Sequence, residues 1–223
     1  MLNIVIDPGH GRRITRPNGD VLIDVGTTGY AQNYCESVNV LAIAYILQDM
    51  FLRRGHRVTL TRTTAQDGKS LEQRCAIAKR ANPNVMLSLH CDSATTQAYE
   101  MRCYYRGERV RSRFTDADLA KSIADNAPQI LKRTPSIIIP CAPKTMDLKI
   151  GIAPRAYNVL RGHGDYPAIL IECGFISQRH IAEYLQSPDG RVATAQGICD
   201  GVLKHFGLYD DAPKTPPFKS TIS

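Results

Sequence analysis

Short apolar runs alternate along this chain with longer segments of helical periodicity. The runs are rich in β-branched residues and nearly continuous in their apolar positions, which is typical of strands covered on both faces in a parallel sheet. Strands are predicted at residues 3–7, 57–61, 85–90 and 168–172. A further run at 99–105 is predicted to add an antiparallel edge strand.

The segments between these runs carry helix signals. Helices are predicted at 36–55, 70–82, 115–133 and 187–207. The first has an apolar stripe at helical spacing and ends in two arginines and a glycine, a common C-terminal stop; the stripe consists of Val38, Leu41, Tyr45 and Leu52. Ser70, Thr115 and Ser187 are predicted to cap the other three helices.

Strands that alternate with helices predict an α/β fold with a mostly parallel, twisted sheet covered by helices on both faces, which makes three layers. No internal repeat or linker interrupts residues 1–209, so we expect one domain there. Residues 210–223 are proline-rich and polar, and we expect a disordered tail or the remnant of a linker.

Composition narrows the class of protein. The 223 residues are 43% hydrophobic and 22% charged, which is ordinary for a globular domain. No apolar run is long enough to span a membrane, so we expect no membrane insertion. Met1 leads directly into the first strand, and we expect no secretory signal.

The chain is basic, with a formal net charge of +7 and a pI near 9.1. A basic surface suits a polyanion, whether nucleic acid, an anionic membrane or an acidic cell wall. The densest basic stretch, residues 104–114, includes Arg109, Arg111 and Arg113. No nucleic-acid-binding motif accompanies it, so we expect no nucleic-acid partner.

The seven cysteines are odd in number, widely spaced and without a C-x-x-C pair. This pattern argues against both a disulfide framework and a cysteine zinc site. We expect reduced thiols, most of them buried as small apolar side chains.

Ionisable side chains follow three of the predicted strands. Asp7 and His10 end the first, His90 ends the strand at 85–90, and Glu172 ends the strand at 168–172. Ligands bind at the carboxyl ends of parallel strands, so these groups are expected to meet at one edge of the sheet. Glu36, at the start of the following helix, joins them. Two imidazoles and one carboxylate can hold a catalytic zinc, and the second carboxylate can act as a general base.

Each residue also has a plain structural interpretation. A histidine in a glycine turn often faces solvent, Glu36 favours a helix N-terminus electrostatically, and Glu172 alone could pair with a basic residue. Alternation along a strand predicts that Cys91 and Cys173 point away from His90 and Glu172. The remaining histidines are expected in turns, loops or on helix surfaces, namely His56, His163, His180 and His205.

Taken together, these motifs resemble zinc-dependent N-acetylmuramoyl-L-alanine amidases over residues 2–207. The resemblance rests on "IVIDPGHG", a glutamate opening the next helix, "RVTLTR", "SLEQRCAIAKRANPNVMLSLHCDSA" and "PAILIECGFIS", in that order. It implies a sheet of about six strands, one zinc per chain bound by His10, Glu36 and His90, and Glu172 as the catalytic carboxylate. Glu172 would take the proton of a zinc-activated water that attacks the amide, and then pass it to the amine of L-alanine.

The chain departs from the family pattern in two places. An extra segment, "RRITRPNGDVLID", lies between His10 and Glu36, and residues 99–165 are hard to align, so no substrate-binding residue is assigned. In some regulated bacterial relatives a helix inserted in that region blocks the zinc. We expect the 115–133 helix to be part of the fold instead.

The implied substrate is peptidoglycan, and we expect a monomer. The missing export signal and reduced cysteines favour a phage endolysin held in the host cytoplasm until it is released to the cell wall. The alternatives are a bacterial wall-remodelling amidase whose export signal has been removed, which would be periplasmic or extracellular, a zinc carboxypeptidase, and a non-catalytic wall-binding module.

Overall fold

The computed structural model describes residues 1–30, 34–94, 98–106, 115–133, 135–141, 158–161 and 166–209. Six strands form the central sheet, in the order β4-β1-β5-β8-β6-β7. Their bounds are β1 Asn3–Pro8, β4 Arg57–Leu60, β5 Val85–Asp92, β6 Arg102–Arg106, β7 Ile137–Cys141 and β8 Ala168–Phe175. Strands β4, β1, β5 and β8 run parallel, whereas β6 pairs antiparallel with β8. The mostly parallel α/β sheet is therefore confirmed.

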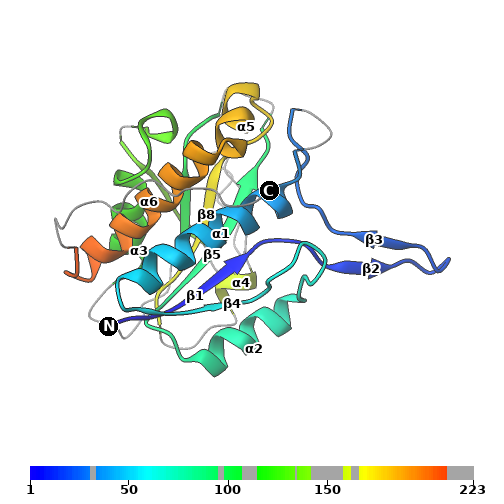
Figure 1. Ribbon diagram of the computed structural model, residues 1–223, viewed down its shortest axis with the longest axis horizontal. Coiled ribbons are helices and arrows are strands. Elements are labelled where there is room, and N and C mark those ends of the chain that lie inside the picture. Colours follow the sequence, from blue (N-terminus) through cyan, green and yellow to red (C-terminus); the bar gives the residue numbers. More distant parts are fainter. Residues whose placement is uncertain are drawn as a thin grey trace.

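Helices cover both faces of this sheet (Figure 1). One face packs on α1 (Glu36–Arg53), α3 (Asp116–Asp125), α5 (Arg179–Gln186) and α6 (Pro188–His205). The other face carries α2 (Leu71–Ala81) and the short α4 (Asn158–Arg161), over a smaller apolar cluster. The cluster consists of Val5, Ala78, Met86, Tyr104, Val159, Leu160, Tyr166, Ala168 and Leu170. The three-layer arrangement follows from strands that are apolar on both faces.

Local signals set several helix starts as predicted. Ser70 forms a reciprocal capping box with Gln73, in which each side chain bonds the other's backbone N–H. The hydroxyl of Thr115 accepts a hydrogen bond from the backbone of Asp118, and that of Ser187 from the backbone of Gly190. These bonds satisfy N–H groups that have no partner within the helix.

The apolar stripe predicted for α1 was wrong. Val38, Tyr45 and Leu52 face solvent. The buried face is offset along the helix, and its apolar residues are Val40, Leu41, Ile43, Ala44, Leu47, Met50 and Phe51. Since α1 carries apolar residues around most of its circumference, more than one stripe fits its periodicity.

Two predictions between residues 99 and 133 also require correction. The strand predicted at 99–105 is β6, and it is antiparallel to β8, as predicted. It is not an edge strand, however, because β7 pairs with its other side and forms the edge of the sheet. The helix predicted at 115–133 ends at Asp125 and is followed by a 3-10 turn, η1 (Gln129–Leu131). Pro128 explains the break, because a proline lacks the N–H that a continuing helix needs and disfavours helical backbone in the residue before it.

The extra segment after His10 forms a separate two-stranded hairpin of β2 (Arg13–Thr15) and β3 (Val21–Ile23). It projects from the body of the domain at the end where α1 begins (Figure 1). Residues 12–22 are exposed throughout. The hairpin therefore adds nothing to the core.

No helix within the described ranges is long and apolar enough to cross a membrane. The predicted tail at 210–223, the arginines at 109, 111 and 113, and His163 fall outside the described residues.

Candidate metal centre

Three of the predicted site residues meet at one edge of the sheet. Donor atoms of His10, Glu36 and His90 all lie within 4.8 Å of one another. Oε1 of Glu36 lies between the two rings, 3.1 Å from Nε2 of His10 and 2.8 Å from Nδ1 of His90. The structure thus brings Glu36, rather than Glu172, between the imidazoles.

His10 stands on a tight turn directly after β1. Its backbone adopts a left-handed conformation with φ of +60°, which is uncommon for a residue other than glycine, and Gly11 follows with φ of +81°. At Gly9, a Cβ would lie 2.4 Å from Cε1 of His90, so a side chain there would collide with the second imidazole. The sequence D-P-G-H-G therefore lets the first histidine approach the second closely.

Two buried arginines hold this turn through its carbonyl oxygens. Arg62 donates to the carbonyls of Pro8 and Gly9 at 3.0 and 2.8 Å. Arg74 donates to those of Pro8 and His10 at 2.9 and 2.8 Å. Three successive carbonyls are thereby fixed, and with them the position of the His10 side chain.

Arg62 also joins the turn to the helix that carries Glu36. Its guanidinium donates to the carbonyl of Ser37 at 2.6 Å, next to Glu36 in the chain. Burial, reinforced by the charge of Arg74, lowers the pKa of Arg62 to about 10. The group is still cationic at neutral pH, so it bonds these carbonyls with a full charge.

Asp7, which the sequence places among the sheet-edge acids, is not part of the cluster of His10, Glu36 and His90. Its carboxylate is fully buried and bonds Arg74 at 2.8 Å and the hydroxyl of Ser88 at 2.8 Å. Removing one partner of such a buried pair typically costs about 3–5 kcal/mol, because the other charge is left without compensation. Asp7 thus fixes Arg74, which in turn fixes the His10 turn.

Glu36 is 2% exposed, and both of its carboxylate oxygens are bonded. Oε1 accepts from the backbone N–H of Cys91 at 3.0 Å, and Oε2 from that of Thr27 at 2.8 Å. Burial alone would raise the pKa of Glu36, but the hydrogen bonds and charges of His10 and His90 lower it far below its ordinary value. The carboxylate is therefore held ionised, the form that binds a cation.

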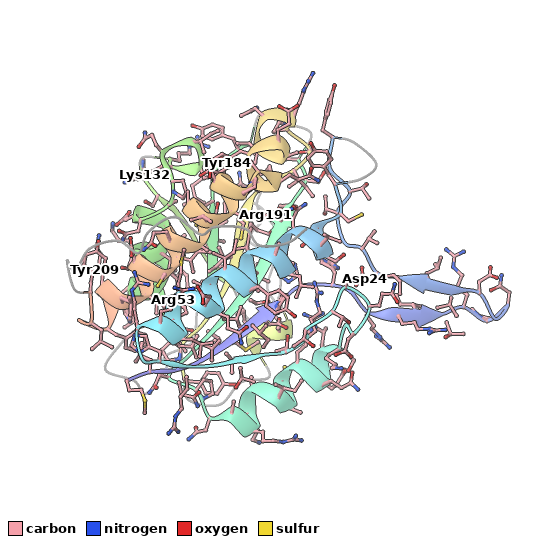
Figure 2. All side chains as sticks on the ribbon, viewed as in Figure 1. Asp24, Arg53, Lys132, Tyr184, Arg191 and Tyr209 are labelled. Carbon is pink, nitrogen blue, oxygen red and sulfur yellow. The ribbon has the colours of Figure 1, made fainter. Side chains whose placement is uncertain are left out.

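Asp24 contacts the outer nitrogen of His10 and was not predicted from the sequence. Nδ1 of His10 lies 3.0 Å from each oxygen of Asp24. Burial lowers the pKa of His10, but Glu36 and Asp24 outweigh burial, so the net pKa is raised. Asp24 lies where the hairpin rejoins the body, beside the start of α1 (Figure 2). A carboxylate on the far side of a ligating histidine fixes its orientation.

Glu172 lies on β8 directly opposite His90 of β5, and Arg102 of β6 lies opposite it on the other side. Residues in register on neighbouring strands share a face of the sheet, so Glu172 is next to His90 but outside the three-residue cluster. The carboxylate is almost fully buried. Burial and the charge of Glu172 raise the pKa of Tyr104 nearby.

The thiols lie apart from this site. Cys91 and Cys173 are buried in the core on the opposite face of the sheet, as strand alternation predicted. Six cysteines whose side chains the structure describes are free: Cys35, Cys75, Cys91, Cys103, Cys173 and Cys199.

A cavity of about 390 Å³ opens beside the two histidines. Arg12, Asp24 and Lys69 line its polar side, and Val159 and Leu170 supply an apolar floor. Helix α3 packs on the opposite face, against α6, and so does not cover the cavity. The 115–133 segment is therefore part of the fold, as expected, and not a helix that blocks this site.

The α/β fold thus carries a candidate metal site of two histidines and one glutamate at the edge of its sheet. The family model of N-acetylmuramoyl-L-alanine amidase matches residues 4–204. The chain therefore belongs to the N-acetylmuramoyl-L-alanine amidase family, and the resemblance noted in the sequence is confirmed.

Two curated relatives match along most of the chain. An uncharacterized cell wall amidase of Bacillus anthracis is 27% identical over 209 residues, which cover 91% of this chain and 35% of the relative. The germination-specific N-acetylmuramoyl-L-alanine amidase of Bacillus subtilis is 23% identical over 232 residues, covering 95% of this chain and 82% of the relative. The chain thus spans about a third of the length of the first.

Solved structures agree on the fold. The N-acetylmuramoyl-L-alanine amidase from Clostridium difficile superposes with a TM-score of 0.72 at 24% identity, over 92% of this chain and 96% of that one. At this identity the likeness concerns the architecture alone.

Proposed function

We propose that this amidase is zinc-dependent and hydrolyses the amide bond between N-acetylmuramic acid and L-alanine in peptidoglycan. The observation that carries the proposal is the cluster of His10, Glu36 and His90 beside an open cavity. Family membership supports the same reaction.

The donor set fits a catalytic zinc. Two imidazole nitrogens and one carboxylate oxygen are a known catalytic combination, which leaves a coordination position for water or substrate. Glu36 is held ionised, and Asp24 on the far side of His10 fixes the orientation of that ring. When bound, zinc supplies Lewis acidity toward the carbonyl oxygen and lowers the pKa of water to about 7.

The remaining roles belong to side chains around the cluster. We assign Glu172 as the general base and acid: its carboxylate takes a proton from the attacking water and returns it to the amide nitrogen as L-alanine leaves. Its register position next to His90 supports this assignment. The apolar floor of Val159 and Leu170 suits the uncharged part of the substrate.

Digestion of purified sacculi tests the proposed reaction directly. Purified protein restored with zinc after chelation should release stem peptides with a new amino terminus on L-alanine, detected by mass spectrometry. Products cut within the peptide would favour the zinc carboxypeptidase, and an undigested sacculus that retains the protein would favour a wall-binding module.

For the biological role, we propose a phage endolysin that acts as a monomer and stays in the host cytoplasm until lysis. Free thiols at the six cysteines whose side chains the structure describes are consistent with a reducing compartment. A bacterial wall-remodelling amidase is the second candidate, because both curated relatives are from Bacillus species. Cytoplasmic expression distinguishes them: an endolysin should lyse a culture abruptly once the membrane is permeabilised, whereas a remodelling enzyme should not.

A further inference from the structure

The β2–β3 hairpin is an exposed arm attached directly to the metal centre. It begins at Arg13, three residues after His10, and ends at Ile23, one residue before Asp24. Arg12 and Asp24, which flank its two strands, both line the cavity beside the histidines. A polymer bound in that cavity can therefore also contact the surface of the hairpin.

Packing does not explain the composition of this arm. Ile14 pairs with Leu22 across the two strands, and this pair can stabilise the hairpin itself. Yet the side chains remain solvent-facing: Ile14 is 42% exposed, Val21 43% and Leu22 40%. An isolated hairpin of this kind is marginally stable on its own, and these exposed apolar side chains are available for contact with a binding partner.

The charged side chains of the hairpin are mostly positive. Residues 12–23 contain three arginines and one aspartate. The aspartate, Asp20, is bonded within the turn by the side-chain amide of Asn18 at 2.7 Å. Arg13 and Arg16 have no side-chain hydrogen bond or ion pair with any residue that the structure describes. Two uncompensated cations therefore stand on an arm that points away from the body (Figure 1).

We propose that this hairpin binds peptidoglycan at a distance from the cleaved bond. Its arginines would attract the negatively charged groups of the wall and so keep the polymer close to the cavity. The inference rests on the proposed amidase function. Stem peptides of the wall carry free carboxylates, which complement Arg13 and Arg16. A strand rises about 3.3 Å per residue, so the three-residue strands alone extend the contact surface by about 10 Å from the cavity. Neighbouring stem peptides on one polymer are then within its reach.

The test compares two matched charge-reversal pairs. Arg13→Glu with Arg16→Glu changes the hairpin. Arg57→Glu with Arg80→Glu makes the same change of net charge at exposed positions, at the start of β4 and in the last turn of α2. Binding is measured by sedimentation with purified sacculi, with a chelator present to prevent digestion. Hydrolysis is measured separately on sacculi and on a soluble N-acetylmuramoyl dipeptide, with zinc restored.

The hairpin pair should weaken sacculus binding about tenfold at low salt, and the control pair much less. Hydrolysis of sacculi should fall about tenfold more than hydrolysis of the dipeptide. If the hairpin variant and the control variant bind sacculi equally well, the proposal is overturned. If the hairpin variant binds sacculi as tightly as the wild type does, the exposed hairpin would instead be a candidate surface for a protein partner. If the wild-type protein pellets with sacculi but cleaves neither substrate, the amidase proposal fails while the arm stands.

Discussion

Both carboxylate oxygens of Asp24 lie 3.0 Å from Nδ1 of His10, while the other ring nitrogen of His10 faces Glu36. The imidazole is thus held between two carboxylates, with Nε2 directed into the metal cluster. Asp24 is itself fixed by the backbone N–H of Gly26 at 3.1 Å. The contacts with Asp24 and Glu36 together set the orientation of the His10 ring.

Replacing Asp24 should therefore weaken metal binding without unfolding the domain. Asp24→Ala is expected to lower zinc affinity about 10- to 100-fold, the usual cost of losing the partner of a ligating histidine. Competition with a chromophoric chelator measures this. Asp24→Asn, which can still accept a hydrogen bond, should lie between wild type and alanine. An affinity unchanged in both variants would show that Asp24 does not position His10.

The crowding at Gly9 gives a second prediction. Gly9→Ala should disturb the histidine pair, because its Cβ would lie 2.4 Å from Cε1 of His90. We expect a loss of zinc affinity larger than the loss of thermal stability. Gly19→Ala is the control: its φ of +89° makes alanine costly to the backbone there too, but a Cβ meets nothing within 4 Å, and the hairpin tip is away from the histidines. If the two variants bind zinc equally well, the close approach at Gly9 does not matter to the site.

Several of these features could be predicted from sequence and others could not. His10, His90 and Glu172 follow apolar strands, and a parallel sheet brings strand ends together, so local pattern and topology sufficed. Asp24 follows a hairpin that folds back on the site, and nothing in its local sequence shows where it returns. Arg62 bonds carbonyl oxygens, which leave no pattern in the side chains. Strand β7 is a short run between prolines, too brief for its periodicity to be distinguished.

His56 provides a pH-dependent prediction away from the metal. Its Nδ1 accepts a hydrogen bond from the backbone of Leu2 at 3.1 Å. Burial, with the charges of the N-terminus and Arg54, lowers the pKa of His56 below its ordinary 6.5. The unfolded chain therefore binds more protons than the folded chain between those two pKa values. Stability from this group is complete above pH 6.5 and falls as the pH drops through the folded pKa.

Urea unfolding of chelated protein at pH 7.5 and pH 5.0 tests this. The free energy of unfolding should fall more for the wild type than for His56→Gln, which has no titrating group there. The comparison between variants removes the contribution of every other group. Equal losses would mean that His56 is not linked to folding.

We expect His10, Glu36 and His90 to bind one zinc while Glu172 moves the proton. Zinc content and release of L-alanine-terminated peptides from sacculi, measured together on wild type, Glu36→Ala, His90→Ala and Glu172→Gln, test it most directly. We predict that the first two variants lose both zinc and product. Glu172→Gln should keep one zinc per chain yet lose about 10²-fold or more in turnover. Full zinc occupancy in Glu36→Ala, or near-wild-type turnover in Glu172→Gln, would contradict the account.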